Sequence, residues 1–213
     1  MPDWKHNIQA PAELDSSDVE VLSDDTVYNG FFKMFKLRLK HKTFSGEWTE
    51  AISRELFHRG EAAAAILYDP HNDTIGLIEQ FRVGALNSDL GPWCLEVVAG
   101  MMEQGEQPEG LIRRELEEEA GIDCADLRHI SSYYSTPGGC SEKIHLYCAI
   151  CNLEGRGGLF GLEQENEDIR FAVCPADEVL KGMYHSRANN AATLLGLQWL
   201  QIYRQELRSE IKD

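Results

Sequence analysis

The feature that most constrains this chain is a loop that leads into a carboxylate-rich segment, GMMEQGEQPEGLIRRELEEEAGI, residues 100–122. Pro108 suits the first turn of a helix, where its missing N–H is no loss. Gly121 suits the left-handed residue that often ends a helix. We therefore expect a helix from about 108 to 120, preceded by a loop.

The segment follows the pattern G-x5-E-x7-R-E-U-x-E-E-x-G-U, in which U is apolar. Its fixed positions are Gly100, Glu106, Arg114, Glu115, Glu118, Glu119 and Gly121. On a helical wheel, Ile112 and Leu116 belong to one apolar side, which should face the protein. Glu115 and Glu119 fall inside that stripe, and Glu118 lies at its border, so two carboxylates are expected to point inward.

Inward carboxylates are costly unless they are paired or bound to a metal ion. The alternative, a solvated helix face, is usual for Glu-rich helices, but the inward placement and the complete pattern favour a cation site here. All-oxygen ligands favour Mg²⁺ or Mn²⁺. We expect Arg114 to orient a carboxylate rather than to touch a substrate, and Glu106 to support the site or to be a further ligand.

The composition excludes several classes of binding partner for this chain. Its 213 residues favour one domain with room for a small appendage. A formal net charge of −16 argues against nonspecific binding of nucleic acid and against docking on anionic membranes. The polar N-terminus predicts no signal peptide, and no apolar run approaches the roughly 18 residues that span a bilayer. Two of the six cysteines, Cys148 and Cys151, are close in sequence, but they lie in an alternating, strand-like run that is typical of core packing. The cysteines therefore predict reduced thiols in a cytoplasmic protein and no structural zinc.

The pattern along the chain predicts a mixed α/β sandwich. Residues 1–18 are expected to form a loose arm, and 19–58 an antiparallel sheet of three strands with a turn at Ser45-Gly46. Further strands are expected at 62–68, 74–82, 94–100, 127–136, 143–153 and 168–174, and further helices at 175–181 and 188–208. The Gly-rich stretch 154–161 is interpreted as a flexible connector, because no phosphate-loop Lys follows it.

The 100–122 pattern resembles the Nudix box, and the chain resembles the bacterial ADP-ribose pyrophosphatase subfamily over nearly its whole length. The motifs that carry this resemblance are YNGFFKMFKLRL, RELFHRG, GLIEQFRVGA, WCLEVVAGMMEQGE, STPGGCSE, QENEDIRF and NNAATLLGLQWL. Pro137 lies 15 residues beyond the box, where the subfamily has its marker proline, although Pro137-Gly138-Gly139 is also an ordinary turn.

The resemblance implies a Nudix α/β/α sandwich with a mixed central sheet, plus a small N-terminal antiparallel sheet. It implies a division into residues 1–58, which form the sheet and a dimer, and residues 59–213, the hydrolase domain. It further implies a homodimer whose active sites use both subunits.

The resemblance also implies roles for individual residues. Glu115 and Glu119 match the principal metal ligands, Glu118 is bound or bridging, and the carbonyl group of Ala99 completes a metal site. Glu167 in QENEDIR matches a loop carboxylate that binds metal. Glu165 matches the base that activates water, although related enzymes take this base from either the box or the loop.

For the substrate, Phe31 resembles the aromatic residue that stacks on adenine, with Phe32 as the alternative. Arg54 and Arg82 resemble residues that contact phosphate or adenine, and Glu142 resembles a carboxylate that reaches the terminal ribose. On sequence alone, surface ion pairs for the arginines and a core contact for Phe31 are the simpler interpretations.

The implied reaction is hydrolysis of ADP-ribose to AMP and ribose 5-phosphate with two to three Mg²⁺ ions. Another Nudix hydrolase of a nucleoside diphosphate sugar, such as GDP-mannose, is the alternative that the box does not distinguish. A noncatalytic Nudix-fold ligand sensor is a further alternative, disfavoured because the chain keeps every box glutamate.

Overall fold

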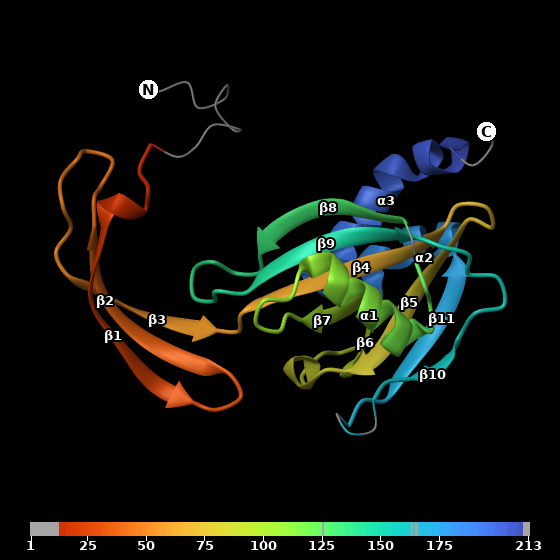
Figure 1. Cartoon of the computed structure of the whole chain (residues 1–213), viewed down its shortest axis with the longest axis horizontal. Helices are drawn as coiled ribbons and strands as arrows, with labels where there is room; N and C mark the ends of the chain where they lie inside the picture. The colour runs from red at the N-terminus through yellow and green to blue at the C-terminus, as the bar shows by residue number, and fades with distance from the viewer. Residues whose placement is uncertain (1–12, 125, 163, 165, 211–213) are drawn as a thin grey trace. The chain divides into compact units, whose positions relative to one another are not determined.

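The computed structural model of the chain describes residues 13–124, 126–162, 164 and 166–210 (Figure 1). It divides into two compact units. The first comprises Met1–Arg59 with Thr136–Ser141, and the second comprises Gly60–Ser135 with Glu142–Asp213. No helix in the described part of the chain is long and apolar enough to cross a membrane.

The first unit contains the expected three-stranded antiparallel sheet. Its strands are β1 (Val19–Asn29), β2 (Lys33–His41) and β3 (Ile52–His58), in the order β1-β2-β3. Gly46 has a φ of 87°, which confirms the turn between β2 and β3. No residue of these three strands is buried in the single chain. Residues 16–18, expected in a loose arm, instead form a short 3₁₀-helix capped by Asp15, while residues 1–12 lie outside the described part.

The second unit is an α/β/α sandwich around a mixed sheet, as predicted. The sheet has the order β10-β11-β5-β4-β9-β8, β6 pairs with β5, and β7 pairs with β4. β4 and β9 run parallel. The strands are β4 (Glu61–Asp69), β5 (Thr74–Phe81), β6 (Trp93–Glu96), β7 (Val98–Met101), β8 (Asp126–Tyr134), β9 (Lys143–Ile150), β10 (Gly158–Phe160) and β11 (Ile169–Pro175).

Helices cover both faces of this sheet (Figure 1). On one face, α1 (Pro108–Ala120) packs Leu111, Ile112 and Leu116 against apolar side chains of the strands. On the other face, α2 (Ala176–Gly182) and α3 (Ala191–Ser209) close a second core. Burial of these two apolar layers is the main driving force for folding of the unit.

Three elements of the second unit differ from the sequence prediction. The run 94–100 is broken at Val97 into β6 and β7, which pair with different strands. The Gly-rich connector contains the short strand β10, paired with β11. The last helix begins at Ala191 rather than at 188, because the side chain of Asn190 caps it by accepting a hydrogen bond from the backbone N–H of Thr193.

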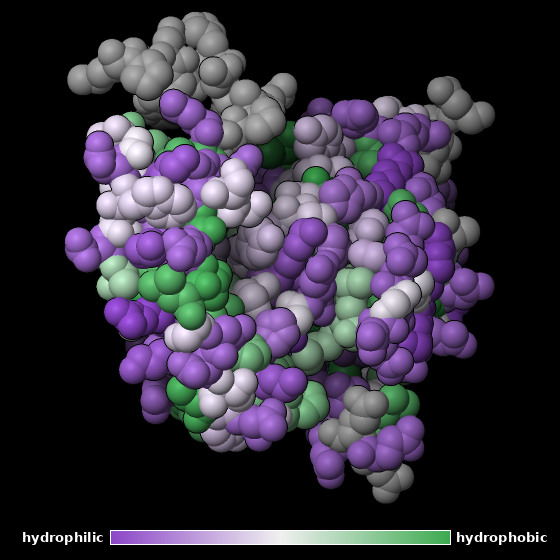
Figure 2. Space-filling view, turned by 60° about the vertical axis from the view of Figure 1, so that its left-hand side comes forward, coloured by the Kyte–Doolittle hydropathy of each residue, from purple (hydrophilic) through white to green (hydrophobic). Residues whose placement is uncertain are grey.

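The molecular surface is strongly polar. On the face shown in Figure 2, hydrophilic side chains predominate and hydrophobic patches are smaller. This agrees with the 26% of charged residues in the sequence.

Candidate active site

The helix at the centre of the candidate site begins and ends where the sequence predicts. Pro108 occupies its first turn, and Gly121 follows its last residue with a φ of 63°. The helix buries Glu119 together with its apolar residues, leaving the Glu119 residue only 2% exposed. Glu115 and Glu118 are partly buried. The inward direction expected for Glu115 and Glu119 is therefore observed.

Strand β7 runs beside α1 and contacts two of its carboxylates. The backbone N–H of Ala99 donates a hydrogen bond to Glu119 Oε2 at 3.2 Å. A Cβ atom placed on Gly100 would lie 2.1 Å from Glu115 Oε1, a distance that real Cβ atoms do not show. The residue that opens the box is thus a glycine because the Glu115 carboxylate occupies the space of a side chain.

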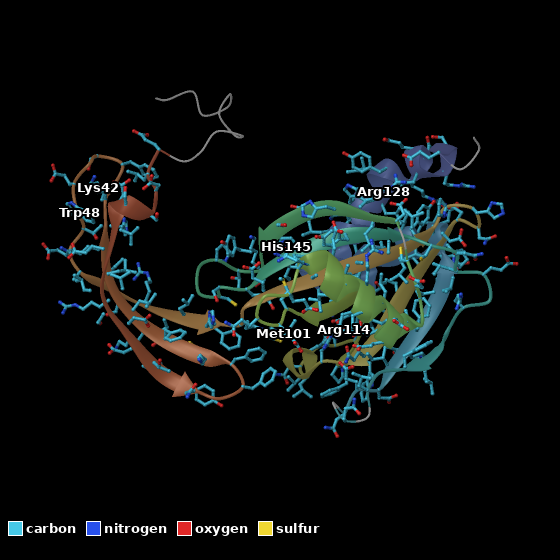
Figure 3. The ribbon with its side chains drawn as sticks, viewed as in Figure 1. Lys42, Trp48, Met101, Arg114, Arg128 and His145 are labelled. Carbon is cyan, nitrogen blue, oxygen red and sulfur yellow. The ribbon has the colours of Figure 1, made fainter. Side chains whose placement is uncertain are left out.

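Arg114 gathers three box carboxylates on the outer side of this arrangement (Figure 3). Its Nη1 lies 2.9 Å from Glu118 Oε2 and 3.0 Å from Glu115 Oε1, and its Nε lies 3.7 Å from Glu106 Oε1. Partial burial lowers the pKa of Arg114, but the three carboxylates outweigh burial, so its pKa is raised. Arg114 is therefore a fixed positive charge that holds these carboxylates in place.

The Glu119 carboxyl has a strongly altered acidity. Burial, together with the charges of Glu115 and Glu167, raises its pKa to about 8, against the opposing effects of the Ala99 N–H and of Arg82. In the absence of a cation, this group is mostly protonated at neutral pH. A divalent cation beside it would remove the repulsion and favour the ionised form.

The donor set fits a hard divalent cation, although the side chains are not gathered around one point. Within the described residues, no three His, Cys, Asp or Glu side chains are arranged to hold a metal ion. Glu115 and Glu118 are instead drawn to Arg114. Carboxylates are the ligands that Mg²⁺ and Mn²⁺ prefer, and the buried charge of Glu119 calls for such a partner.

Two further side chains adjoin the site and were missed by the sequence analysis. Glu96 accepts hydrogen bonds from Arg82, with its Oε2 2.9 Å from Nε and 2.7 Å from Nη2. Gln80, which is buried, donates to Glu167 Oε1 at 3.4 Å. A signal existed for Glu96, since it is a carboxylate between the apolar residues Leu95 and Val97. No feature of the sequence around Gln80 indicated a role for this residue in the site.

These contacts place Arg82 near the box carboxylates. Burial lowers the pKa of Arg82, but Glu96 in the first place, and Glu119 and Glu167 to a smaller extent, outweigh burial and raise it. The structure therefore brings Arg82, Glu119 and Glu167 into electrostatic range of one another. Glu165, predicted as the base, lies outside the described residues.

The remaining predicted residues are distributed between the two units. Glu142 in the second unit is half-buried, and its charge adds to the burial that raises the pKa of Tyr133 to about 12. In the first unit, Arg54 is exposed and donates to the carbonyl group of Ser53. Phe31 is 88% exposed there.

The neighbouring aromatic residue has a structural role. The Phe32 ring packs between Phe57 at 5.3 Å and the guanidinium of Arg59 at 4.7 Å. It touches Phe31 edge-on at 4.8 Å. Of the two phenylalanines, Phe31 has the ring that is open for stacking. Pro137 is exposed in a turn of the same unit.

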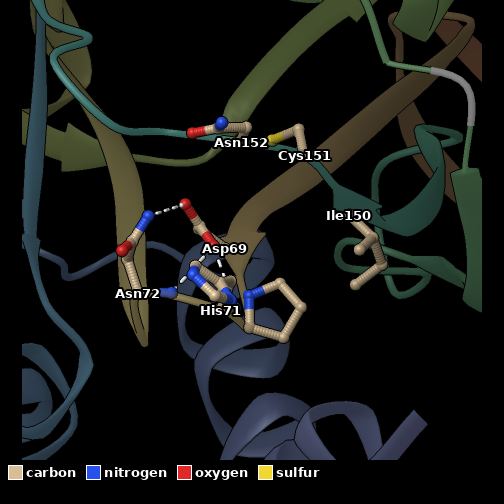
Figure 4. Close-up of a pocket in the computed structure, with 7 residues that line it drawn as sticks. Asp69, His71, Asn72, Ile150, Cys151 and Asn152 are labelled. Carbon is tan, nitrogen blue, oxygen red and sulfur yellow. Dashed lines mark hydrogen bonds between the residues drawn. The ribbon is translucent and has the colours of Figure 1, made fainter. Parts of the chain in front are cut away.

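A separate pocket lies at the turn between β4 and β5, and none of the predicted site residues lines it (Figure 4). Its volume is about 310 Å³, and residues 69–72 and 150–152 line it. The buried Asp69 carboxylate accepts hydrogen bonds from the backbone N–H groups of His71, Asn72 and Leu153 and from the Asn72 side chain. With its acceptors satisfied in this way, Asp69 stabilises the turn, and the pocket has no convergent unpaired groups that would mark a reactive site.

Comparisons with known proteins agree with this geometry. Residues 58–194 match the NUDIX domain. The chain is 38% identical over 212 residues to the ADP-ribose pyrophosphatase of Haemophilus influenzae, covering 98% of both chains. It is 38% identical to that of Escherichia coli K12, covering 94% of this chain and 96% of the relative.

Two more distant similarities were found, one in sequence and one in structure. A GDP-mannose pyrophosphatase of Salmonella typhimurium is 29% identical over 87% of this chain and 96% of its own length. A crystal structure of an ADP compounds hydrolase superposes with a TM-score of 0.64 at 22% identity, covering 86% of this chain and 95% of that one. The box geometry, the domain match and the near full-length relatives together establish that this chain belongs to the NUDIX domain family.

Proposed function

We propose that this chain hydrolyses the diphosphate of ADP-ribose to AMP and ribose 5-phosphate. The observation that carries the proposal is its 38% identity to the Haemophilus influenzae ADP-ribose pyrophosphatase over 98% of both chains. This likeness extends through the N-terminal sheet, which the domain match beginning at residue 58 does not cover. The inward-directed carboxylates of α1 would hold the cations that diphosphate chemistry requires.

The cofactor in this proposal is Mg²⁺, or Mn²⁺, with two or three ions per site. Glu115, Glu119 and the carbonyl oxygen of Ala99 would hold it, with Glu118 and Glu167 as further ligands. The support is the chemistry of these all-oxygen donors and the burial of Glu119 among like charges. When bound, such ions neutralise phosphate oxygens and lower the pKa of water.

The other residues of the site would bind, orient and move a proton. Arg82, held through two of its nitrogens by Glu96, would direct its guanidinium toward the phosphates. Arg114 would keep the box carboxylates in place, with Glu106 supporting it from the loop. Glu165 would accept the proton of the attacking water on its carboxylate.

The substrate's two ends would be bound by other residues. Phe31 would stack on adenine, supported by its high exposure. Arg54 would contact the phosphates or the adenine side, and Glu142 would reach the terminal ribose. These roles explain how a chain with a net charge of −16 receives an anion, since arginines and cations act locally.

We further propose a homodimer in which residues 1–58 form the contact, residues 59–213 form the hydrolase domain, and the subunits share active sites. The support is a sheet that buries none of its residues while exposing apolar ones, including Val21, Val27 and Tyr28. A cytoplasmic location is supported by six free cysteines.

Steady-state rates with Mg²⁺ on ADP-ribose, GDP-mannose, NADH and diadenosine polyphosphates test the proposal. ADP-ribose should have the highest kcat/KM, with AMP and ribose 5-phosphate as products. GDP-mannose is the second candidate, because a relative with that activity in its name is 29% identical. A higher kcat/KM on GDP-mannose would replace the substrate assignment, and a lack of Mg²⁺-dependent turnover on every compound would favour a ligand sensor.

A further inference from the structure

Strands β8 and β9 carry a chain of polar side chains that the box does not use. Ser132 Oγ lies 2.9 Å from His129 Nε2 and 2.8 Å from His145 Nδ1. On the other side of the ring, His145 Nε2 lies 2.7 Å from Glu61 Oε2. Two imidazoles therefore converge on one oxygen atom, and a carboxylate supports one of them from behind.

A β-bulge creates this convergence. His129 pairs with Tyr147 and Ser132 pairs with His145, with a shift of register between His129 and Ser131. In a regular strand, residues three apart point to opposite faces. The extra residue turns His129 and Ser132 to the same face, and bulges commonly re-aim side chains in this way.

The face on which they lie is set by the core. Tyr147 packs in the cluster formed with α1, and the His129 ring touches the Tyr147 ring edge-on at 5.3 Å. His145 precedes Tyr147 by two residues, so it lies on the same face of the sheet. Figure 3 labels His145 there on β9. The backbone thus fixes both histidines from neighbouring strands.

The hydrogen bond between His145 and Glu61 fixes which ring nitrogen of His145 donates and which accepts. An ionised carboxylate only accepts, so Glu61 accepts a hydrogen bond from His145 Nε2–H, and this hydrogen bond lowers the pKa of Glu61. A neutral imidazole that donates from Nε2 has its lone pair on Nδ1, and Nδ1 of His145 is the atom beside Ser132. His129 is exposed, and its tautomer decides whether Nε2 donates or accepts.

We propose that His129 Nε2 and His145 Nδ1 bind a divalent transition-metal ion of the Zn²⁺, Ni²⁺ or Cu²⁺ class, beside the Ser132 hydroxyl and with water completing the coordination. Imidazole nitrogen suits these ions, whereas Mg²⁺ prefers oxygen. A carboxylate that accepts from the second nitrogen of a ligating histidine orients the ring and raises its basicity. Glu61 has this position behind His145.

The ligand atoms of this site differ from those of the box. The box offers carboxylate oxygens, whereas this site offers two nitrogens, so the proposal does not depend on the proposed function. Ser132, His145 and Glu61 are also hydrogen-bonded in series, as the hydroxyl, imidazole and carboxylate of a hydrolytic triad are. The second imidazole on the same hydroxyl has no counterpart in such a triad and favours metal binding.

Pulsed EPR of the protein loaded with less than one equivalent of Cu²⁺, without a histidine tag and with excess Mg²⁺ on the carboxylates, tests the proposal. The wild-type spectrum should show coupling to two imidazoles, and His129→Ala and His145→Ala should each leave one. His71→Ala, an exposed histidine at the β4–β5 turn, is the matched control and should keep both.

Titration with Zn²⁺ adds a second measurement. Glu61→Gln should keep both imidazole couplings but weaken Zn²⁺ affinity by about 10- to 100-fold. The proposal is wrong if the wild-type spectrum shows fewer than two imidazoles, or if His129→Ala leaves it unchanged. Because His129 is exposed, this variant decides the question even if His145→Ala does not fold.

Discussion

Gly100 and Glu115 lie so close together that a Cβ atom on Gly100 would fall 2.1 Å from Glu115 Oε1. The strand β7, in which the box begins, and the helix that carries its carboxylates are therefore packed without room for a methyl group. This contact explains why a glycine stands at the first position of the pattern, and it makes the position of the Glu115 carboxylate sensitive to a single atom.

Gly100→Ala should lower kcat/KM by about a hundredfold, since a displacement near 1 Å can cost that much. The free energy of unfolding should change little, because the obstructing atoms belong to the end of a flexible side chain. Turnover and urea unfolding measure the two effects. Gly110→Ala is the control within α1: nothing lies within 4 Å of its added Cβ. It should retain full activity, and equal losses in both variants would exclude this explanation.

Glu119→Gln should reduce turnover by at least about a hundredfold while preserving the fold. Glutamine has the same shape and still offers an oxygen to the Ala99 N–H, but it removes the buried charge. Rates at saturating Mg²⁺ and circular dichroism check the two parts. Glu117→Gln, on the exposed side of the same helix, should be nearly silent. Near-normal rates for Glu119→Gln would remove Glu119 from the metal site.

Arg114→Lys should lower kcat/KM by about 10- to 100-fold, as for other residues that orient metal ligands. Lysine keeps the charge but has a single nitrogen, whereas Arg114 contacts Glu115 and Glu118 through Nη1 and Glu106 through Nε. The dependence of the rate on Mg²⁺ concentration should shift upward. Arg128→Lys, which affects a surface ion pair, is the control. An unchanged Mg²⁺ dependence in Arg114→Lys would contradict the orienting role.

Asp73→Asn should destabilise the protein by about 1–3 kcal/mol at pH 7, because it weakens hydrogen bonds to a charged group. Arg204 in the first place lowers the pKa of Asp73, with Tyr68 and Arg208 adding to the effect against partial burial. Asp73 has a φ of 57°, which Asn tolerates. The substitution therefore tests charge rather than backbone strain.

The pH dependence of this difference has a definite sign. The folded pKa of Asp73 lies below the unfolded value of about 3.9, so its contribution is complete above that value. It is lost as the pH falls through the folded pKa. Urea unfolding of both proteins from pH 7 to pH 3 should show the gap closing. If the difference in the free energy of unfolding stayed constant with pH, the effect would be due to packing rather than charge. The control is Asp89→Asn, at an exposed site, which should show no such difference at any pH.

Features with local causes were predictable from the sequence. The helix 108–120 is confirmed because Pro108, Gly121 and the apolar period act within a few residues. The break at Val97 was not predicted, since it depends on a hydrogen bond from the Val97 N–H to Thr193 Oγ1, far along the chain. The strand β10 was missed for a related reason, because it forms only by pairing with β11.

The sequence by itself determined the family pattern, the layered α/β architecture and the inward direction of Glu115 and Glu119. These follow from residue spacing, which turn and helix geometry convert directly into orientation. The tertiary structure alone decided that Glu96 holds Arg82 and that Gln80 reaches Glu167. The pairing of His129 and His145 around Ser132 likewise depends on a bulge between strands. Strand register is a long-range property, set by partners distant in sequence, and no local spacing encodes it.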